Sequence, residues 1–206
     1  GQYGSLASRY TKALARSMSS TKEIKAANVL NNAQTAGYNG GDGVVLLSAS
    51  HPTQNGNQSN VLSTAADLSE TSLESILIQI SDMKDDRGLR IAAQGTQLII
   101  PTAYQFVAER LLESQLRTGT ADNDINAIKA GGYLPQGYHI MRRLTDADAF
   151  FVQTDVPDGL KMFQRSAMKK GMEGDFETGN VRYKVRERYS FGVTDWRGVF
   201  GTEGAA

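Results

Sequence analysis

The feature that most constrains the fold of this chain is a regular alternation of side chains close to its C-terminal end. From position 181 the odd positions are mostly apolar or aromatic, whereas four even positions are basic: Arg182, Lys184, Arg186 and Arg188. Successive side chains of a β-strand point to opposite faces, so this pattern predicts a strand with one buried face and one cationic face. A long two-faced strand, in a chain without a recognisable catalytic set, indicates a protein that works by contacting copies of itself.

The balance of charge and the missing residue types exclude several classes of protein. The 206 residues carry 22 Lys and Arg against 22 Asp and Glu, so the formal net charge is zero. Dedicated nucleic-acid-binding proteins usually have a basic excess, so any contact with DNA is expected to be local and weak. The chain has no cysteine, which excludes disulfides and thiolate zinc sites. No apolar run reaches the length of a membrane-spanning helix.

A long helix is predicted at the other end of the chain, over residues 6–33. No proline or glycine lies between Ser5 and Ala36, and apolar or small side chains recur at three-to-four spacing. A helix of this length extends for roughly 40 Å. Because its apolar stripe is thin, we expect it to lie across a sheet or a neighbour rather than inside a core. Gly37 is the expected C-terminal stop.

Shorter elements are predicted between these two ends, and their order favours an α+β fold because there is no regular βαβ alternation. We expect a strand at 44–47, a surface loop at 48–66, and a helix that starts with a capping box at 71–74 and ends at Gly88. A strand at 97–100 is followed by a helix capped by Thr102, whose buried side chains are Phe106, Val107, Leu111 and Leu112. A loop is expected at 118–137, and strands at 140–144, 150–154 and 160–165. The first helix is expected to pack on the last strands, which makes one lobe discontinuous.

Candidate chemical sites are few. His51 precedes a proline in a polar segment and is interpreted as surface or turn polarity, and His139 as a structural histidine at the start of a strand. The carboxylates Asp82, Asp85 and Asp86 are interpreted as a solvated helix end. Residues 122–126 resemble the opening of a calcium loop, but the sixth and twelfth positions lack the required Gly and Glu. The motifs of serine hydrolases, zinc peptidases and P-loop proteins are absent. We therefore predict no catalytic residue, metal or cofactor, and no enzyme.

The cationic face of the terminal strand is the main candidate for a functional contact. Same-face residues of a strand lie about 6.8 Å apart, which is close to the phosphate spacing along one DNA strand. In a chain of zero net charge, ion pairing with acidic loops of an adjacent subunit is the favoured interpretation. Plain solvation and a contact with DNA stay open as alternatives. Arg182, Lys184, Arg186 and Arg188 are thus candidates for inter-subunit or DNA contacts.

The order of these segments resembles the major capsid (head) protein of tailed bacteriophages, in particular the Mu-like head-subunit branch. The resemblance rests on Leu68 and Leu73 before an amphipathic helix ending at Gly88, on residues 98–112 and 143–152, and on residues 175–178 together with 186–196. It implies an α+β fold in which a long spine helix packs on extended strands in a peripheral domain, beside an α/β axial domain. The implied peripheral domain is residues 1–37 and 173–206, and the implied axial domain is residues 38–172.

The same resemblance implies a structural function. The chain would be a subunit that self-assembles through pentamers and hexamers into an icosahedral head enclosing double-stranded DNA, located in the virion after assembly in the host cytoplasm. No membrane contact is implied. The family's N-terminal arm and extended loop precede the spine helix and are expected to be missing from this chain, so no residue of an inter-subunit crosslink is assigned. An encapsulin-like protein nanocompartment is the main alternative; an enzyme with an unrecognised site and a DNA-binding module are others.

Overall fold

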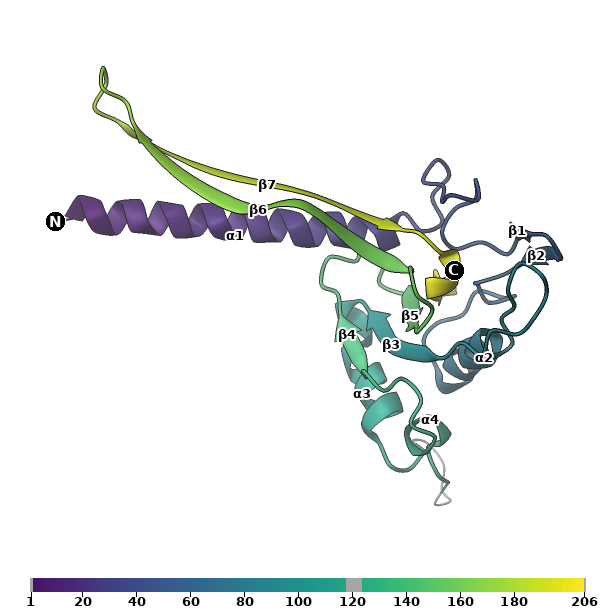
Figure 1. The fold of residues 1–206 in the computed structure, drawn as a ribbon. Helices are drawn as coiled ribbons and strands as arrows, with labels where there is room; N and C mark the ends of the chain where they lie inside the picture. The colour runs from purple at the N-terminus through teal and green to yellow at the C-terminus, as the bar shows by residue number, and fades with distance from the viewer. Residues whose placement is uncertain (1, 118–123, 206) are drawn as a thin grey trace.

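The computed structural model describes residues 2–117 and 124–205, with side chains from residue 8 onward. A long arm projects from a mixed α/β body (Figure 1). The arm consists of helix α1 (Gln2–Asn31) and the hairpin of strands β6 (Leu160–Gly174) and β7 (Val181–Val193). The long helix that the sequence predicts is thereby confirmed, and the terminal strand is one half of a hairpin much longer than the predicted segment 160–165.

The body contains the shorter elements. They are β1 (His51–Thr53), β2 (Gly56–Gln58), α2 (Glu70–Ser81), β3 (Gly95–Ile100), α3 (Gln105–Glu113) with the preceding 3-10 turn Thr102–Tyr104, α4 (Ala127–Ala130), β4 (Tyr138–Ile140), β5 (Phe150–Thr154), the 3-10 turn Trp196–Gly198 and β8 (Val199–Thr202). Its main sheet has the order β4-β3-β5-β8, in which β3 and β4 are parallel and the other neighbours are antiparallel. The α+β class predicted from the sequence is confirmed.

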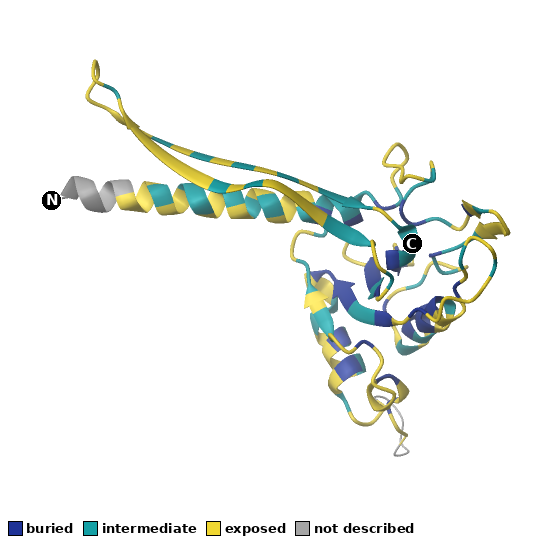
Figure 2. Cartoon of the chain, in the orientation of Figure 1, coloured by how far each residue is buried: buried dark blue, intermediate teal, exposed yellow. Residues whose placement is uncertain are grey.

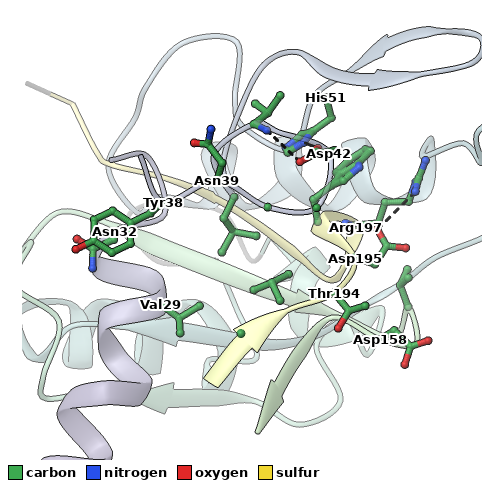
Figure 3. Close-up of a pocket in the computed structure, with 18 of the residues that line it drawn as sticks. Val29, Asn32, Tyr38, Asn39, Asp42, His51, Asp158, Thr194, Asp195 and Arg197 are labelled. Atoms are coloured by element: carbon green, nitrogen blue, oxygen red, sulfur yellow. Dashed lines mark hydrogen bonds and ion pairs between the residues drawn. The ribbon is translucent and has the colours of Figure 1, made fainter. Parts of the chain in front are cut away.

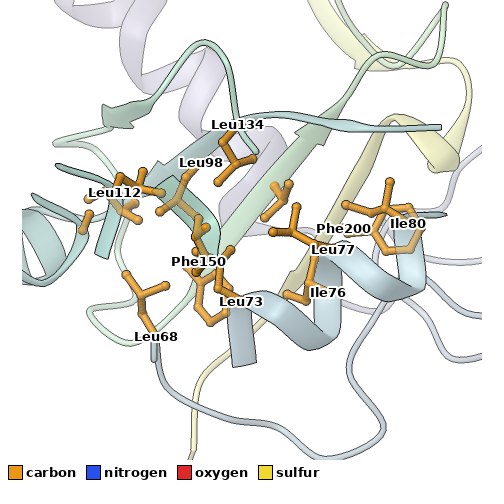
Figure 4. Packing of buried hydrophobic residues seen from close by; sticks show 14 of the residues in the cluster. Leu68, Leu73, Ile76, Leu77, Ile80, Leu98, Leu112, Leu134, Phe150 and Phe200 are labelled. Carbon is orange, nitrogen blue, oxygen red and sulfur yellow. The ribbon is translucent and has the colours of Figure 1, made fainter. Parts of the chain in front are cut away.

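The main sheet is covered on both faces, which explains why its strands are continuously apolar rather than alternating. On one face, Leu98, Phe150 and Phe200 pack against α2, whose side chains Leu73, Ile76, Leu77 and Ile80 point at the sheet (Figure 4). On the other face, Ile99, Phe151 and Val199 pack with Leu30 and Ala33 at the C-terminal end of α1 and just beyond it. The base of the arm is therefore anchored in the second core cluster of the body.

Helix α2 begins and ends earlier than the sequence predicts. Its capping box is formed by Ser69 and Ser72 rather than by residues 71–74, and the last helical residue is Ser81 rather than one next to Gly88. Beyond the helix end, Asp85 orders a turn, because its carboxylate accepts hydrogen bonds from the backbone N–H groups of Arg87 and Leu89 at 2.8 Å each. These hydrogen bonds, led by the one from Leu89, lower the pKa of Asp85.

The segment predicted as a strand at 44–47 and a surface loop at 48–66 folds differently. Residues 44–47 form only an isolated bridge between Asn39 and Val45, and the loop contains the β1–β2 hairpin. The reason is the side chain of Asn60, which is fully buried and occupies the backbone groups that a strand partner would otherwise use. It donates to Leu46 O at 2.7 Å and accepts from Ser48 N at 2.9 Å.

The remaining expectations for the body are met in part. Strand β3 and the strand at 150–154 are confirmed, whereas 140–144 contributes only the end of β4. In α3, Ala108 and Leu112 are buried but Phe106 is exposed, and Thr102 makes no capping hydrogen bond. Within the predicted loop 118–137, residues 118–123 lie outside the described residues. Asn126 caps α4 by accepting hydrogen bonds from Ile128 N and Lys129 N.

Candidate functional site

The arm is held together by contacts between α1 and β7, as the sequence predicts. The Nζ of Lys22 lies 2.6 Å from Oε1 of Glu187, and the Glu187 side chain is only 2% exposed. The same ammonium group lies 5.3 Å from the centre of the Tyr189 ring, a cation–π contact. The ring of Tyr189 in turn packs edge-on against Phe191. One cation of α1 thus joins the helix to two residues of the hairpin.

The two halves of the arm have matching lengths. The 30 residues of α1 extend for about 45 Å at the rise of an α-helix. The 13 residues of β7 extend for about 43 Å at the rise of a β-strand. Both run outward from the body, and the hairpin tip bends away from the helix (Figure 1). The helix therefore supports most of the hairpin, and the tip is unsupported.

The alternation along β7 separates two faces, and the face toward α1 is only half-buried. Tyr183, Val185, Glu187 and Tyr189 are of intermediate burial, whereas the even positions between them are exposed. Figure 2 shows that fully buried residues are concentrated in the body, while most of the arm is exposed or intermediate. The predicted two-faced strand is confirmed. Its inner face is less buried than the sequence suggests, because a single helix covers one hairpin.

The four predicted cations occupy the exposed face of β7. Arg182 pairs with Asp175 across the hairpin turn at 3.2 Å. Arg186 lies directly opposite Lys169 of β6, whereas Lys184 and Arg188 lie opposite Gly171 and Ser166. We call Lys169, Lys184, Arg186 and Arg188 the cationic strip. In the part of the chain that the structure describes, none of the four has an ion-pair partner.

The hairpin tip combines a tight turn with exposed apolar side chains. Asp175 orders the turn, since its carboxylate accepts from Glu177 N and from the Thr178 hydroxyl. Phe176 next to it is fully exposed, and Met172 and Val181 are also exposed. Apolar side chains gathered at the end of a projecting hairpin are typical of a contact surface.

A cleft of about 750 Å³ lies at the base of the arm, between the end of α1, the loop around residues 38–52 and the start of the hairpin (Figure 3). At its inner wall His51 is fully buried and stacks on Trp196, with the ring centres 4.2 Å apart. Its Nδ1 lies 2.6 Å from Asp42 and its Nε2 lies 3.1 Å from Oδ1 of Asn60. Both ring nitrogens thus face oxygen atoms of neighbouring side chains.

The interpretation of His51 as surface polarity is therefore wrong. The local sequence carries no sign of its burial, because the groups that enclose it come from three separate segments around Asp42, Asn60 and Trp196. Asn60 adds a 3.0 Å hydrogen bond to Val199 O, 139 positions away. His139, by contrast, lies in β4 and is exposed. The polar groups around His51 bind one another, so they join loops rather than present a reactive group to the cleft.

The carboxylates after α2 do not gather at one point. Asp82 pairs with Arg90 at 2.9 Å, and Asp86 pairs with Arg197 at 2.6 Å. The guanidinium of Arg197 also lies over the ring of Trp196, which ties this turn to the wall of the cleft. Within residues 2–117 and 124–205 no group of three acidic, His or Cys side chains could hold a metal ion. Among the helices of these residues, none contains an apolar stretch of membrane-spanning length.

Comparisons with known proteins show what this chain is similar to. A family model described as phage capsid protein matches residues 1–201. No curated protein matches the chain significantly. Among solved structures, the chain is similar to one of Mycobacterium phage Che8, with 16% identity and a TM-score of 0.50, over 95% of this chain and 63% of that one. This likeness shows a shared fold.

Two further structures are more distant. One is the capsid of an empty GTA particle, with 13% identity and a TM-score of 0.48 over 98% of this chain and 65% of that one. The other is a virus-like particle from Pyrococcus furiosus, with 14% identity and a TM-score of 0.43 over 69% of this chain and 55% of that one. The chain spans less than two thirds of the length of each of the three structures.

Proposed function

Because the chain belongs to the phage capsid protein family, we propose that it is a structural subunit that assembles with copies of itself into a closed icosahedral head around double-stranded DNA. The observation that carries the proposal is the arm, in which α1 lies along β7 and leaves long flanks uncovered. In a monomer such an arm would expose protein surface to solvent without adding to the buried core. Neighbouring copies would cover it.

The mechanism follows from repetition rather than from any one strong contact. Each subunit in a closed shell makes the same set of interfaces, so modest contacts multiply into a stable container. We propose residues 1–37 and 173–206 as the peripheral domain and residues 38–172 as the axial domain, which would meet its copies around five-fold and six-fold axes. Packaged DNA would contact the inner surface weakly and without sequence preference. The proposed location is the virion, after assembly in the host cytoplasm.

The proposal is tested by electron microscopy of the protein expressed from its complete reading frame. We expect closed shells, and particles recovered from infected cells should retain nuclease-resistant double-stranded DNA. Shells that contain a bound enzyme and no DNA would favour the alternative of a protein nanocompartment. A protein that stays monomeric at every concentration and salt would contradict both and would reopen the search for an enzymatic site.

A further inference from the structure

The charges of this chain are segregated between the arm and the body, although the whole is neutral. Side chains of α1 and of residues 160–193 include thirteen Lys and Arg against five Asp and Glu, a net charge of +8. Residues 32–159 and 194–206 carry nine Lys and Arg against seventeen Asp and Glu, a net charge of −8. Opposite fields of this size attract two copies to each other when an arm approaches a body.

The cationic strip is left without compensation inside its own subunit. Lys169 and Arg186 lie directly opposite each other across the hairpin, a placement of like charges that destabilises an antiparallel pair. The inner face of the hairpin is already covered by α1, so the strip faces outward. Since the arm runs away from the body (Figure 1), the acidic residues of the body lie far from the strip of the same subunit. The strip therefore lowers the stability of the monomer unless a partner supplies negative charge.

The body offers exposed carboxylates that also lack a cationic partner. Four of them are Asp67, Asp146, Asp148 and Glu203, which we call the acidic edge; all are exposed, and no Lys, Arg or His of the described residues pairs with them. They lie near one another beside β8. Asp146 and Glu203 border the same small hollow, Asp67 accepts from Ala205 N, and Gly204 lies against Asp148.

We propose that the cationic strip of one subunit docks on the acidic edge of a second copy of this chain. The inference rests on the proposed shell function and names the surfaces that build it. A protein partner fits better than DNA for two reasons. The counter-charge is present on the chain itself in equal amount, and the strip ends in the exposed side chains of Met172, Phe176 and Val181. Apolar side chains gain from burial against protein, whereas a phosphate backbone offers them little.

A charge exchange tests this contact. Lys184→Glu with Arg186→Glu reverses the strip, and Asp146→Lys with Asp148→Lys reverses the acidic edge. We expect each reversed protein to need about a tenfold higher concentration to assemble, because like charges then meet across the interface. The protein that carries all four substitutions should recover, since attraction is restored with the signs exchanged. Sedimentation velocity and light scattering at several salt concentrations report assembly.

The matched control places the same change of charge elsewhere on the arm. Arg9→Glu with Lys12→Glu alters exposed residues of α1 and should leave the assembly threshold within about twofold of the unsubstituted protein. Circular dichroism confirms that each variant folds; Lys184→Gln with Arg186→Gln provides a milder second variant.

Each result bears on the proposal. If the protein with all four substitutions does not recover assembly, the proposed contact is overturned. Unchanged assembly of the strip-reversed protein, with loss of packaged DNA, would also overturn it and assign the strip to DNA. In both cases the unsubstituted protein still forms shells, so the proposed function stands. An unsubstituted protein that never assembles would overturn the function and this inference together.

Discussion

The ammonium group of Lys22 and the carboxylate of Glu187 lie 2.6 Å apart, although 165 positions separate them in the sequence. This ion pair joins α1 to β7. The Glu187 side chain is almost completely enclosed, whereas its neighbours on the inner face are only half-buried. The second oxygen of the same carboxylate is buried and has no hydrogen-bond partner among the described residues. The ion pair is thus one of the contacts that hold the helix on the hairpin, beside the contact between Lys22 and the Tyr189 ring.

Replacing Lys22 with alanine should loosen the arm. The substitution leaves the Glu187 carboxylate buried without a counter-ion, which costs about 3 kcal/mol of unfolding free energy. Hydrogen exchange of β7 amides and chemical denaturation measure the effect. Lys12→Ala, at an exposed position of the same helix, is the control and should change stability by less than about 0.5 kcal/mol. Equal losses in the two variants would show that the ion pair does not hold the arm.

Replacing Asn60 with alanine should destabilise the wall of the cleft by about 3 kcal/mol, the upper end of the cost of leaving a buried polar group unsatisfied. The amide joins Ser48, Leu46 and Val199 with hydrogen bonds of 2.9, 2.7 and 3.0 Å. Thermal unfolding measures the loss, and quenching of the single Trp196 reports opening of the wall. Asn57→Ala, which alters an exposed residue of β2, should leave both unchanged.

Replacing Gly198 with alanine should destabilise the junction between the hairpin and the body. A Cβ at Gly198 would lie 2.3 Å from the Cα of Gly159, a backbone atom that cannot turn aside. Overpacking of this kind costs about 1–3 kcal/mol. Gly171→Ala is the matched control, because no atom of the described residues lies within 4 Å of a Cβ added there. Denaturant unfolding that ranks the control as the less stable protein would contradict the close approach of the two backbones.

The stability of the protein should fall above pH 10 through Tyr104. Burial raises the pKa of this phenol above its ordinary value of 10.0, and the carboxylates of Asp67 and Asp148 raise it further. The neutral ring thus contributes stability that is fully present below pH 10 and is lost as the pH rises through the folded-state pKa. In Tyr104→Phe this loss disappears. Unfolding curves of both proteins from pH 8 to about 11.5 measure the difference, and parallel curves would contradict the prediction.

Local periodicity accounts for the parts of the fold that were predictable. The run without Pro or Gly marks α1, the alternation from Val181 marks β7, and the apolar run before Pro101 marks β3. Each of these signals depends on residues a few positions apart, which interact through the geometry of one helix or strand. Helix α2 starts about half a helical turn before the predicted cap Thr71, because several residues there are good caps and the structure uses Ser69.

The sequence by itself determined the long helix, the two-faced strand and their resemblance to a known family, because these features are written in neighbouring residues. Only the tertiary structure decided what the polar residues do. His51 is enclosed by segments that the chain brings together from positions 42, 60 and 196, and Glu187 receives its counter-ion from the first helix. The free energy of a buried polar or charged group depends on partners distant in sequence, so the pattern around each residue carries no record of them.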